Sequence, residues 1–157
     1  MLQAYLKTPL GTASIIAGED GVRSISVSDS EIEIPEKTDP RLIEAVSQLQ
    51  EYFEGKRTGF TFKISPQGTE FQKKVWQSLL EIPYGKTMSY HELSARLGDT
   101  KAIRAVASAN ARNPLWIVVP CHRVIGSDGS LTGYAGGLWR KKWLLDHENP
   151  VKQQLLF

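Results

Sequence analysis

The feature that most constrains the fold is a change of hydrophobic period along the chain. Residues 2–27 alternate between apolar and polar side chains, which is the period-two pattern of half-buried strands. Turn-forming residues interrupt this pattern at 9–11 (Pro-Leu-Gly) and at 18–21 (Gly-Glu-Asp-Gly). The N-terminal stretch is therefore predicted to form a three-stranded antiparallel meander.

After residue 38 the apolar residues recur with the 3.6-residue period of a helix. This pattern predicts one helix from Asp39-Pro40 to about Phe53, and another from Thr69 to about Ile82. The stretch between them is rich in glycine, proline and charge, so it is predicted to hold at most a short strand. The fold class is α+β. The predicted parts are an N-terminal domain of three strands plus a helix (1–60), a linker (61–68) and a mostly helical C-terminal domain (69–157).

The C-terminal domain contains the pattern of a helix-turn-helix. Ser89 and Glu92 have the spacing of a capping box, which predicts a helix to about Leu97. Gly98-Asp99-Thr100 then turns the chain, and Thr100 is expected to cap a second, alanine-rich helix over residues 101–111. Many helical hairpins look alike, so this pattern alone is weak evidence for DNA binding.

The only cysteine of the chain, Cys121, follows a short apolar run. Residues 116–119 are Trp-Ile-Val-Val, which predicts a short buried strand that ends at Pro120. A lone cysteine is more often a small buried hydrophobe than a nucleophile. Its place at a strand end, with His122 beside it as a possible base, favours a reactive thiol. Such help is needed because few thiols are ionised at neutral pH.

A last helix is predicted over residues 138–147. It follows a glycine-rich loop, residues 133–137, that would let the backbone approach a ligand closely. Asn149-Pro150 ends the helix, and the remaining tail has no assigned role. The residues expected to anchor this helix in the core are Trp139, Trp143, Leu144 and Leu145.

The net charge of +2 conceals an asymmetry between the two halves. Residues 1–66 carry 7 basic and 10 acidic side chains, a net charge of −3, whereas residues 67–157 carry 12 and 7, a net charge of +5. Such a bias is often only a solvated surface. It is also the footprint expected if the C-terminal part binds a polyanion such as nucleic acid.

Cysteine count and hydropathy exclude several classes of protein. One cysteine excludes an internal disulfide, and one cysteine with three histidines in no ligand-like spacing argues against a metal site. The longest apolar runs are far below the roughly 18 residues of a membrane span, and the first residues of the sequence lack the basic segment followed by an apolar one that is typical of a secretory signal. We therefore expect an intracellular, cytoplasmic protein with no membrane partner.

A set of short motifs surrounds Cys121. Pro-Cys-His-Arg-Val-Ile at 120–125 lies between Asn113-Pro114 and Gly-Tyr-Ala-Gly-Gly-Leu at 133–138, and Trp-Leu-Leu-Asp-His-Glu follows at 143–148. In this order and spacing the set resembles the O6-alkylguanine-DNA alkyltransferases, also called methylated-DNA-protein-cysteine methyltransferases. The resemblance implies direct DNA repair by an irreversible, single-turnover transfer of an alkyl (methyl) group from O6-alkylguanine, and from O4-alkylthymine, to Cys121, without a cofactor. The product thioether is too stable to hydrolyse.

The resemblance also implies the catalytic roles. Cys121 is the alkyl acceptor, and His122 carries its proton through a water. Glu148 orients the histidine, by the logic of other nucleophile, histidine and carboxylate sets. Asn113 braces the turn beneath the site, and Tyr90 gives a proton to the departing guanine and contacts the nearby phosphate.

The family binds double-stranded DNA in the minor groove, with little sequence preference, and turns the damaged nucleotide out of the duplex. By resemblance, Arg104 fills the space left behind, and the small residues of the same helix approach the DNA backbone. The resemblance also implies a monomer with access to the chromosome. The residues implied at the DNA are Arg104, Ala105, Ala107, Ser108, Tyr90 and Arg112.

The substrate pocket follows from the same resemblance. Tyr134 stacks on the extruded base, while the Val124 carbonyl and the backbone around Ala135 contact its edges. Trp116 stands where many relatives carry a smaller residue, and Ala135 stands where a serine is frequent. These two departures leave open which alkyl groups are accepted.

Three other functions are compatible with parts of the pattern. A recognition module that binds alkylguanine without chemistry usually carries another residue, commonly tryptophan, in place of the cysteine, so Cys121 argues against it. A cysteine hydrolase would need an oxyanion-hole motif, and none is evident. A transcriptional regulator would need a further domain, for which 157 residues leave no room.

Overall fold

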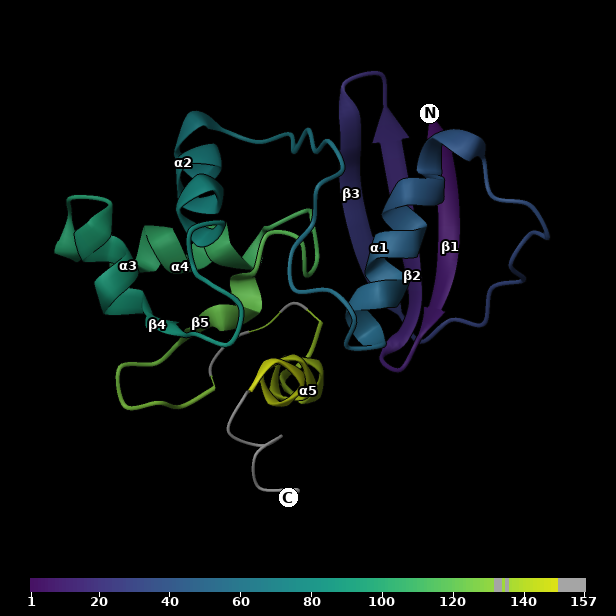
Figure 1. Ribbon diagram of the computed structural model, residues 1–157. Coiled ribbons are helices and arrows are strands. Elements are labelled where there is room, and N and C mark those ends of the chain that lie inside the picture. Colours follow the sequence, from purple (N-terminus) through teal and green to yellow (C-terminus); the bar gives the residue numbers. More distant parts are fainter. Residues whose placement is uncertain (132–133, 135, 150–157) are drawn as a thin grey trace. The chain divides into compact units, whose positions relative to one another are not determined.

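The computed structural model describes residues 1–131, 134 and 136–149, which divide into two compact units (Figure 1). The first unit comprises residues 1–67 and, from much later in the chain, residues 114–118. The second comprises residues 68–113 and the chain from residue 119 onward. The predicted C-terminal domain, 69–157, thus includes five residues that pack with the first unit.

The first unit is built on the predicted meander, which is confirmed. Strands β1 (Leu2–Thr8), β2 (Gly11–Gly18) and β3 (Gly21–Ser28) form an antiparallel sheet in the order β1-β2-β3. Both connections are tight, since Thr8 pairs with Gly11 and Gly18 pairs with Gly21. Gly21 has a φ of 132°, which a side chain would disfavour.

One face of this sheet is covered by helix α1 (Ile43–Phe53), which follows a single 3-10 turn at Pro40–Leu42 (Figure 1). The Asp39 carboxylate caps that turn by accepting from the Arg41 amide at 2.9 Å, as expected for a helix start. Leu49 and Tyr52 are fully buried. Ile43, which fits the apolar period, is instead half exposed at the first residue of the helix.

Residues 114–118 do not form the predicted strand at 116–119; instead Leu115 pairs beside β3 in an isolated parallel bridge with Ile25. Ile25 donates its amide to the Pro114 carbonyl at 2.8 Å and accepts from the Trp116 amide at 3.0 Å. The chain then turns, because the Val118 amide donates back to the Trp116 carbonyl at 2.8 Å around Ile117, whose φ is 71°. The run is buried as predicted, but an apolar run alone does not separate a strand from a buried turn. Positive φ at a β-branched residue costs about 1–3 kcal/mol.

The second unit begins with helix α2 (Glu70–Leu79), whose predicted cap is confirmed. The Thr69 hydroxyl accepts from the Gln72 amide, and the Gln72 side chain accepts from the Thr69 amide in a capping box. Trp76 is buried, and its indole donates to the Ala109 carbonyl at 2.8 Å. Phe71, expected on the same apolar face, is 40% exposed.

The predicted helix-turn-helix is present. Strand β4 (Met88–Ser89) leads into α3 (Tyr90–Arg96), which the expected capping box of Ser89 and Glu92 opens. A 3-10 turn (Thr100–Ala102) precedes α4 (Ile103–Ala111). The cap of that turn is Asp99, not Thr100, because the Asp99 carboxylate accepts from the Lys101 amide at 2.9 Å. An aspartate carboxylate caps the start of a helix as effectively as a threonine hydroxyl does.

The rest of the second unit is a 3-10 turn at Cys121–Arg123, strand β5 (Val124–Ile125), which runs parallel to β4, and helix α5 (Leu138–Glu148). The predicted anchors of α5 are only partly correct. Leu144 is fully buried, but Trp139 is 54% exposed and lies on the Arg140 guanidinium at 4.5 Å. The buried face of α5 is largely charged and consists of Arg140, Lys141, Leu144 and Glu148.

No helix in the described part of the chain combines the length and the apolar character that crossing a membrane requires.

Candidate active site

Cys121 is the first residue of the 3-10 turn in the second unit, and its side chain is nearly buried. The backbone before it is folded tightly, because the Cys121 amide donates to the Val119 carbonyl at 2.8 Å across Pro120. The φ and ψ of Pro120, −81° and 65°, are those of an inverse γ-turn. The side-chain Nδ2 of Asn113 donates to the same Val119 carbonyl at 2.7 Å. The turn that presents the thiol is therefore held from both sides.

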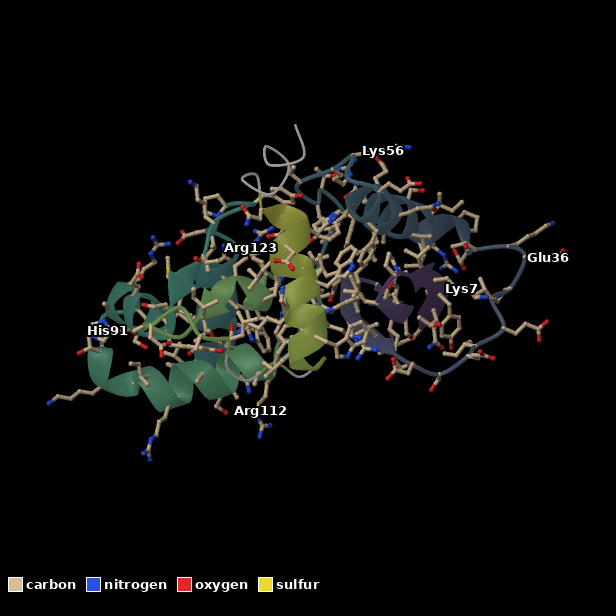
Figure 2. All side chains as sticks on the ribbon, turned by 90° about the horizontal axis from the view of Figure 1, so that it is seen from below. Lys7, Glu36, Lys56, His91, Arg112 and Arg123 are labelled. Carbon is tan, nitrogen blue, oxygen red and sulfur yellow. The ribbon has the colours of Figure 1, made fainter. Side chains whose placement is uncertain are left out.

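A buried ion cluster lies directly after the cysteine. Glu148 is the last residue of α5. Its Oε2 is hydrogen-bonded to His122 Nε2 at 2.8 Å, and its Oε1 accepts a hydrogen bond from Arg123 Nε at 2.7 Å. Arg123 Nη2 also donates to Glu148 Oε2 at 3.1 Å, and Nη1 donates to the Ile82 carbonyl at 2.7 Å. Figure 2 shows Arg123 beside the C-terminal part of α5. All three side chains are buried.

The cluster fixes the charge state of its members. Burial alone would raise the pKa of Glu148, but hydrogen bonds and charges from His122 and Arg123 outweigh it and lower that pKa to about 2. Burial lowers the pKa of His122, and Glu148 only partly opposes this. The resting arrangement at neutral pH is a neutral imidazole backed by a Glu148–Arg123 ion pair.

The thiol of Cys121 is also neutral at rest. Burial raises its pKa, and the side chains of Asn113, Lys141 and Tyr134 counter that effect in part. A buried thiol cannot shed its proton into bulk water, so a neighbouring base has to take it. His122 Nδ1 is buried and has no hydrogen-bond partner among residues 1–131, 134 and 136–149. That nitrogen is free to be the base.

The sequence patterns do not predict two residues of the site. Arg123 has no predicted role beyond its place in the motif at 120–125, although it makes three of the hydrogen bonds in the cluster. Lys141 is fully buried, with Nζ 5.8 Å from the centre of the Tyr90 ring. The spacing of Lys141 from Glu148 could have placed it near the site, because residues seven apart on a helix share a face.

The other predicted pocket residues are placed as follows. Tyr90 is the first residue of α3 and is half-buried. Val124 is fully buried and pairs with Met88 of β4. Ala135 lies outside the described residues. Trp116 belongs to the first unit, where it packs against Phe53 at 5.9 Å between ring centres, and its role in substrate binding stays a prediction.

Helix α4 presents a polar face and an apolar one. Val106, Ala109 and Asn110 are buried within the second unit. The residues predicted to meet DNA lie mostly on the opposite face. Those exposed are Arg104, Ala105, Ser108 and Arg112, whereas Ala107 is half-buried. The exposed residues form a stripe of small and cationic side chains, which suits close approach to a phosphate backbone.

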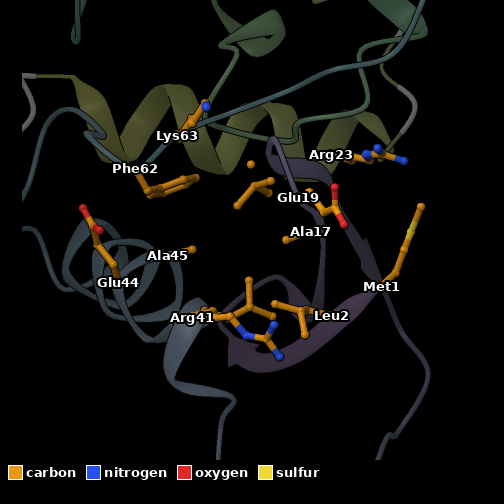
Figure 3. A pocket seen from close by; sticks show the side chains of 14 residues that line it. Met1, Leu2, Ala17, Glu19, Arg23, Arg41, Glu44, Ala45, Phe62 and Lys63 are labelled. Carbon is orange, nitrogen blue, oxygen red and sulfur yellow. The ribbon is translucent and has the colours of Figure 1, made fainter.

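The first unit contains a cavity of about 800 Å³ between the start of β1, the β2–β3 turn and the start of α1 (Figure 3). Its walls combine apolar side chains such as Leu2 and Phe62 with charged ones such as Arg23, Arg41 and Glu44. Neither cysteine nor histidine lines it. The groups able to perform nucleophilic chemistry are those around Cys121 in the second unit.

The chain is similar to known proteins along nearly its whole length. The family model for the DNA-binding domain of 6-O-methylguanine DNA methyltransferase matches residues 70–150, and the model for the ribonuclease-like domain of the same methyltransferase matches residues 1–66. A methylated-DNA–protein-cysteine methyltransferase of Methanosarcina acetivorans is 44% identical over 153 residues, covering 94% of this chain and 98% of the relative. The constitutive Bacillus subtilis protein of that name is 48% identical over 138 residues, covering 83% and 84%.

A solved structure shares the fold. The crystal structure of Mycobacterium tuberculosis OGT in complex with DNA superposes with a TM-score of 0.83 at 38% sequence identity, covering 99% of each chain.

Proposed function

Because this chain belongs to the 6-O-methylguanine DNA methyltransferase family, we propose that it repairs DNA by moving an alkyl group from the guanine O6 atom to the sulfur of Cys121. The observation that carries the assignment of Cys121 is its setting. The cysteine is held in a braced turn, next to a neutral histidine that a buried carboxylate supports. The relatives are named for this transfer to a protein cysteine.

The reaction begins with the thiol proton. His122 takes it at Nδ1, through a water, and Glu148 stabilises the imidazolium that forms on the other nitrogen. Arg123 holds the Glu148 carboxylate in place from the opposite side. His122 thus supplies the base that the buried, neutral thiol needs.

The transfer itself exchanges one bond for another. The sulfur forms a bond to the alkyl carbon while the bond from that carbon to O6 breaks, and the electron pair of the broken bond stays with the guanine. The guanine anion takes up a proton, for which Tyr90 is the proposed donor. His122 then releases the thiol proton to solvent, and Tyr90 regains a proton from solvent, so the number of protons on the protein and the guanine balances. Water cannot hydrolyse the thioether to regenerate the thiol, so each protein molecule acts once.

The DNA would be bound through the exposed face of α4. The M. tuberculosis relative has been crystallised with DNA, and the matched family model is that of a DNA-binding domain. We further propose binding in the minor groove by a monomer, with the damaged nucleotide turned out of the duplex at a cost of a few kcal/mol. Arg104 would fill the gap, and Tyr134 would stack on the extruded base. O4-alkylthymine is the proposed second substrate.

Mass spectrometry tests the proposal directly. The protein is incubated with duplex DNA that contains one O6-methylguanine, and the intact protein and its peptides are then weighed. We expect one methyl group per molecule, on the peptide that contains Cys121, and none in a Cys121→Ser control. Protein that binds the damaged duplex without gaining a methyl group would overturn the transferase assignment in favour of a recognition module.

A further inference from the structure

Helix α5 begins with a buried arginine beside an exposed tryptophan. Arg140 lies in the first turn of the helix and is only 6% exposed. Its guanidinium carbon lies 4.5 Å from the centre of the exposed Trp139 ring, which is within the range of a cation–π contact. Trp139 therefore has a partner at the surface, and its indole restrains the guanidinium.

The Arg140 guanidinium ties the helix to the glycine-rich loop that precedes it. Arg140 Nη1 donates to the Gly136 carbonyl at 2.8 Å, a bond that the charge of the donor strengthens. Gly136 lies in a turn that the Gly137 amide closes by donating to the Tyr134 carbonyl at 2.9 Å. The turn leads directly into α5, since Gly137, with a φ of 94°, is the residue that caps the helix. The side chain of Arg140 thus reaches back and holds the turn that carries Tyr134.

The same contacts lead to the reactive sulfur. A methyl group on Gly136 would lie 3.1 Å from the Tyr134 ring and 3.4 Å from Arg140 Cδ, so the ring and the arginine stem both pack closely against this glycine. The Tyr134 hydroxyl is buried, and the side chain is near enough to Cys121 to lower the pKa of its thiol. Arg140 is therefore connected through Gly136 to the side chain proposed to stack on the extruded base.

We propose that Arg140 is a positioning residue for substrate binding, whose hydrogen bond to the Gly136 carbonyl holds the Tyr134 ring where the extruded base stacks. The inference rests on the proposed function. A loop rich in glycine loses much conformational freedom when it is ordered. Because Arg140 orders the turn before the base arrives, less of that cost falls on binding.

This role should affect binding of the base more than the transfer step. The groups that activate the thiol lie on other segments, where His122 and Arg123 are bonded to Glu148. Loss of the Arg140 bond leaves these contacts in place. The substrate concentration that gives half of the maximal rate should therefore rise, while the maximal rate stays nearly the same.

The test combines substitutions at Arg140 with a double-mutant cycle. Arg140→Met keeps most of the apolar stem and removes the donor, whereas Arg140→Lys keeps a charged donor. Lys142→Met is the matched control, because Lys142 is an exposed neighbour on the same helix that pairs with Asp146 at 2.9 Å. Tyr134→Ala, alone and together with Arg140→Met, completes the cycle. Each protein is reacted with increasing concentrations of free O6-benzylguanine, so that DNA binding does not enter the measurement.

We expect Arg140→Met to raise the half-saturating concentration about tenfold and to leave the maximal rate within about threefold of the wild type. Arg140→Lys should recover part of the affinity, and Lys142→Met should match the wild type. In the Tyr134→Ala background, Arg140→Met should have no further effect. An equal effect of Arg140→Met in both backgrounds, or a loss confined to the maximal rate, would overturn the proposal.

A surface substitution keeps the test decisive if Arg140→Met does not fold by circular dichroism. Trp139→Leu removes the ring that restrains the guanidinium, and it should raise the half-saturating concentration about two- to fivefold, again only when Tyr134 is present. An unchanged concentration in this variant would then overturn the proposal. A wild type that takes no alkyl group from O6-benzylguanine or from a duplex containing O6-methylguanine would overturn the proposed function, and this inference with it.

Discussion

The two units of this protein bury different kinds of side chain. Within the described residues, the first unit buries no aspartate, glutamate, lysine, arginine or histidine; its buried side chains with polar atoms include Thr12, Gln48 and Tyr52. The second unit buries a histidine, a glutamate, a lysine and two arginines. Buried charge is costly and gives little net stability even when it is paired. The difference indicates that the first unit is built for stability, whereas the second accepts a cost in stability for its chemistry.

Breaking the ion cluster should give the largest effect. Glu148→Gln leaves the Arg123 guanidinium buried without a counter-charge, so we expect a loss of about 3–5 kcal/mol in the free energy of unfolding, together with slow reaction on O6-benzylguanine. Urea denaturation measures the first and alkylation kinetics the second. Asp146→Asn, an exposed carboxylate on the same helix that pairs with Lys142, should cost less than about 1 kcal/mol. Similar losses in both variants would remove the distinction between buried and exposed pairs.

The same cluster predicts sensitivity to acid. The folded pKa of Glu148, about 2, lies below its ordinary value of 4.5. Its contribution is therefore complete above pH 4.5 and is lost as the pH falls toward 2, a change of about 3 kcal/mol. The lowered pKa of buried His122 adds a loss that begins below its ordinary value of 6.5. Urea titrations from pH 7 to 2 should show the wild type and Glu148→Gln converging, and a constant gap would contradict this account.

The first unit should respond to the loss of hydrogen bonds rather than to the loss of a buried ion pair. Gln48 donates to the Thr61 hydroxyl at 2.7 Å and to the Glu44 carboxylate at 3.2 Å, and it accepts from the Thr61 backbone amide at 2.9 Å. Gln48→Ala should cost about 1–3 kcal/mol, equally at pH 7 and pH 5, with transfer activity unchanged. The exposed Gln50→Ala on the same helix should stay within about 0.5 kcal/mol of the wild type. A fall in the transfer rate of folded Gln48→Ala would show that the units do not divide the work in this way.

The smallest effect of a substitution is expected on the exposed face of α4, because its side chains contribute little to the folded core. Arg104→Ala should slow reaction with duplex DNA about tenfold, equivalent to about 1.4 kcal/mol, and leave the reaction with free O6-benzylguanine and the unfolding free energy unchanged. Arg96→Ala, an exposed arginine on α3 that pairs with Glu81 at 3.6 Å, is the control. Equal loss on both substrates would remove the role of Arg104 in base extrusion.

Local signals in the sequence predicted local structure well. The meander, the Thr69 cap and the capping box of Ser89 and Glu92 were predicted correctly, because each depends on residues close together in the chain. The pairing of His122 with Glu148, which only the family resemblance could suggest, also stands in the structure. A single helix cap was displaced by one residue, since Asp99 and Thr100 are both good capping residues and the sequence does not choose between them.

The errors have a common physical cause, which is that periodicity rules assign apolar residues to the interior and charged residues to the surface. Helix α5 reverses this rule, with Trp139 exposed and Lys141 buried. The bond from Arg123 to the Ile82 carbonyl spans 41 residues of sequence, a separation that no local pattern encodes. Residues 116–119 were correctly expected to be buried, but the turn at Ile117 depends on pairing with Ile25 nearby.

That pairing has a consequence for how the protein is made. The edge of β3 is paired at Val22 by Lys63 and Ser65, but at Ile25 it is completed only by Pro114 and Trp116, about ninety residues later in the chain. During synthesis the first unit therefore emerges with this part of the strand edge unpaired and waits for most of the second unit to be translated. Contacts of such long sequence separation slow folding, and an open edge invites association with other chains. The nascent protein should be most prone to aggregate between the emergence of residue 67 and that of residue 118.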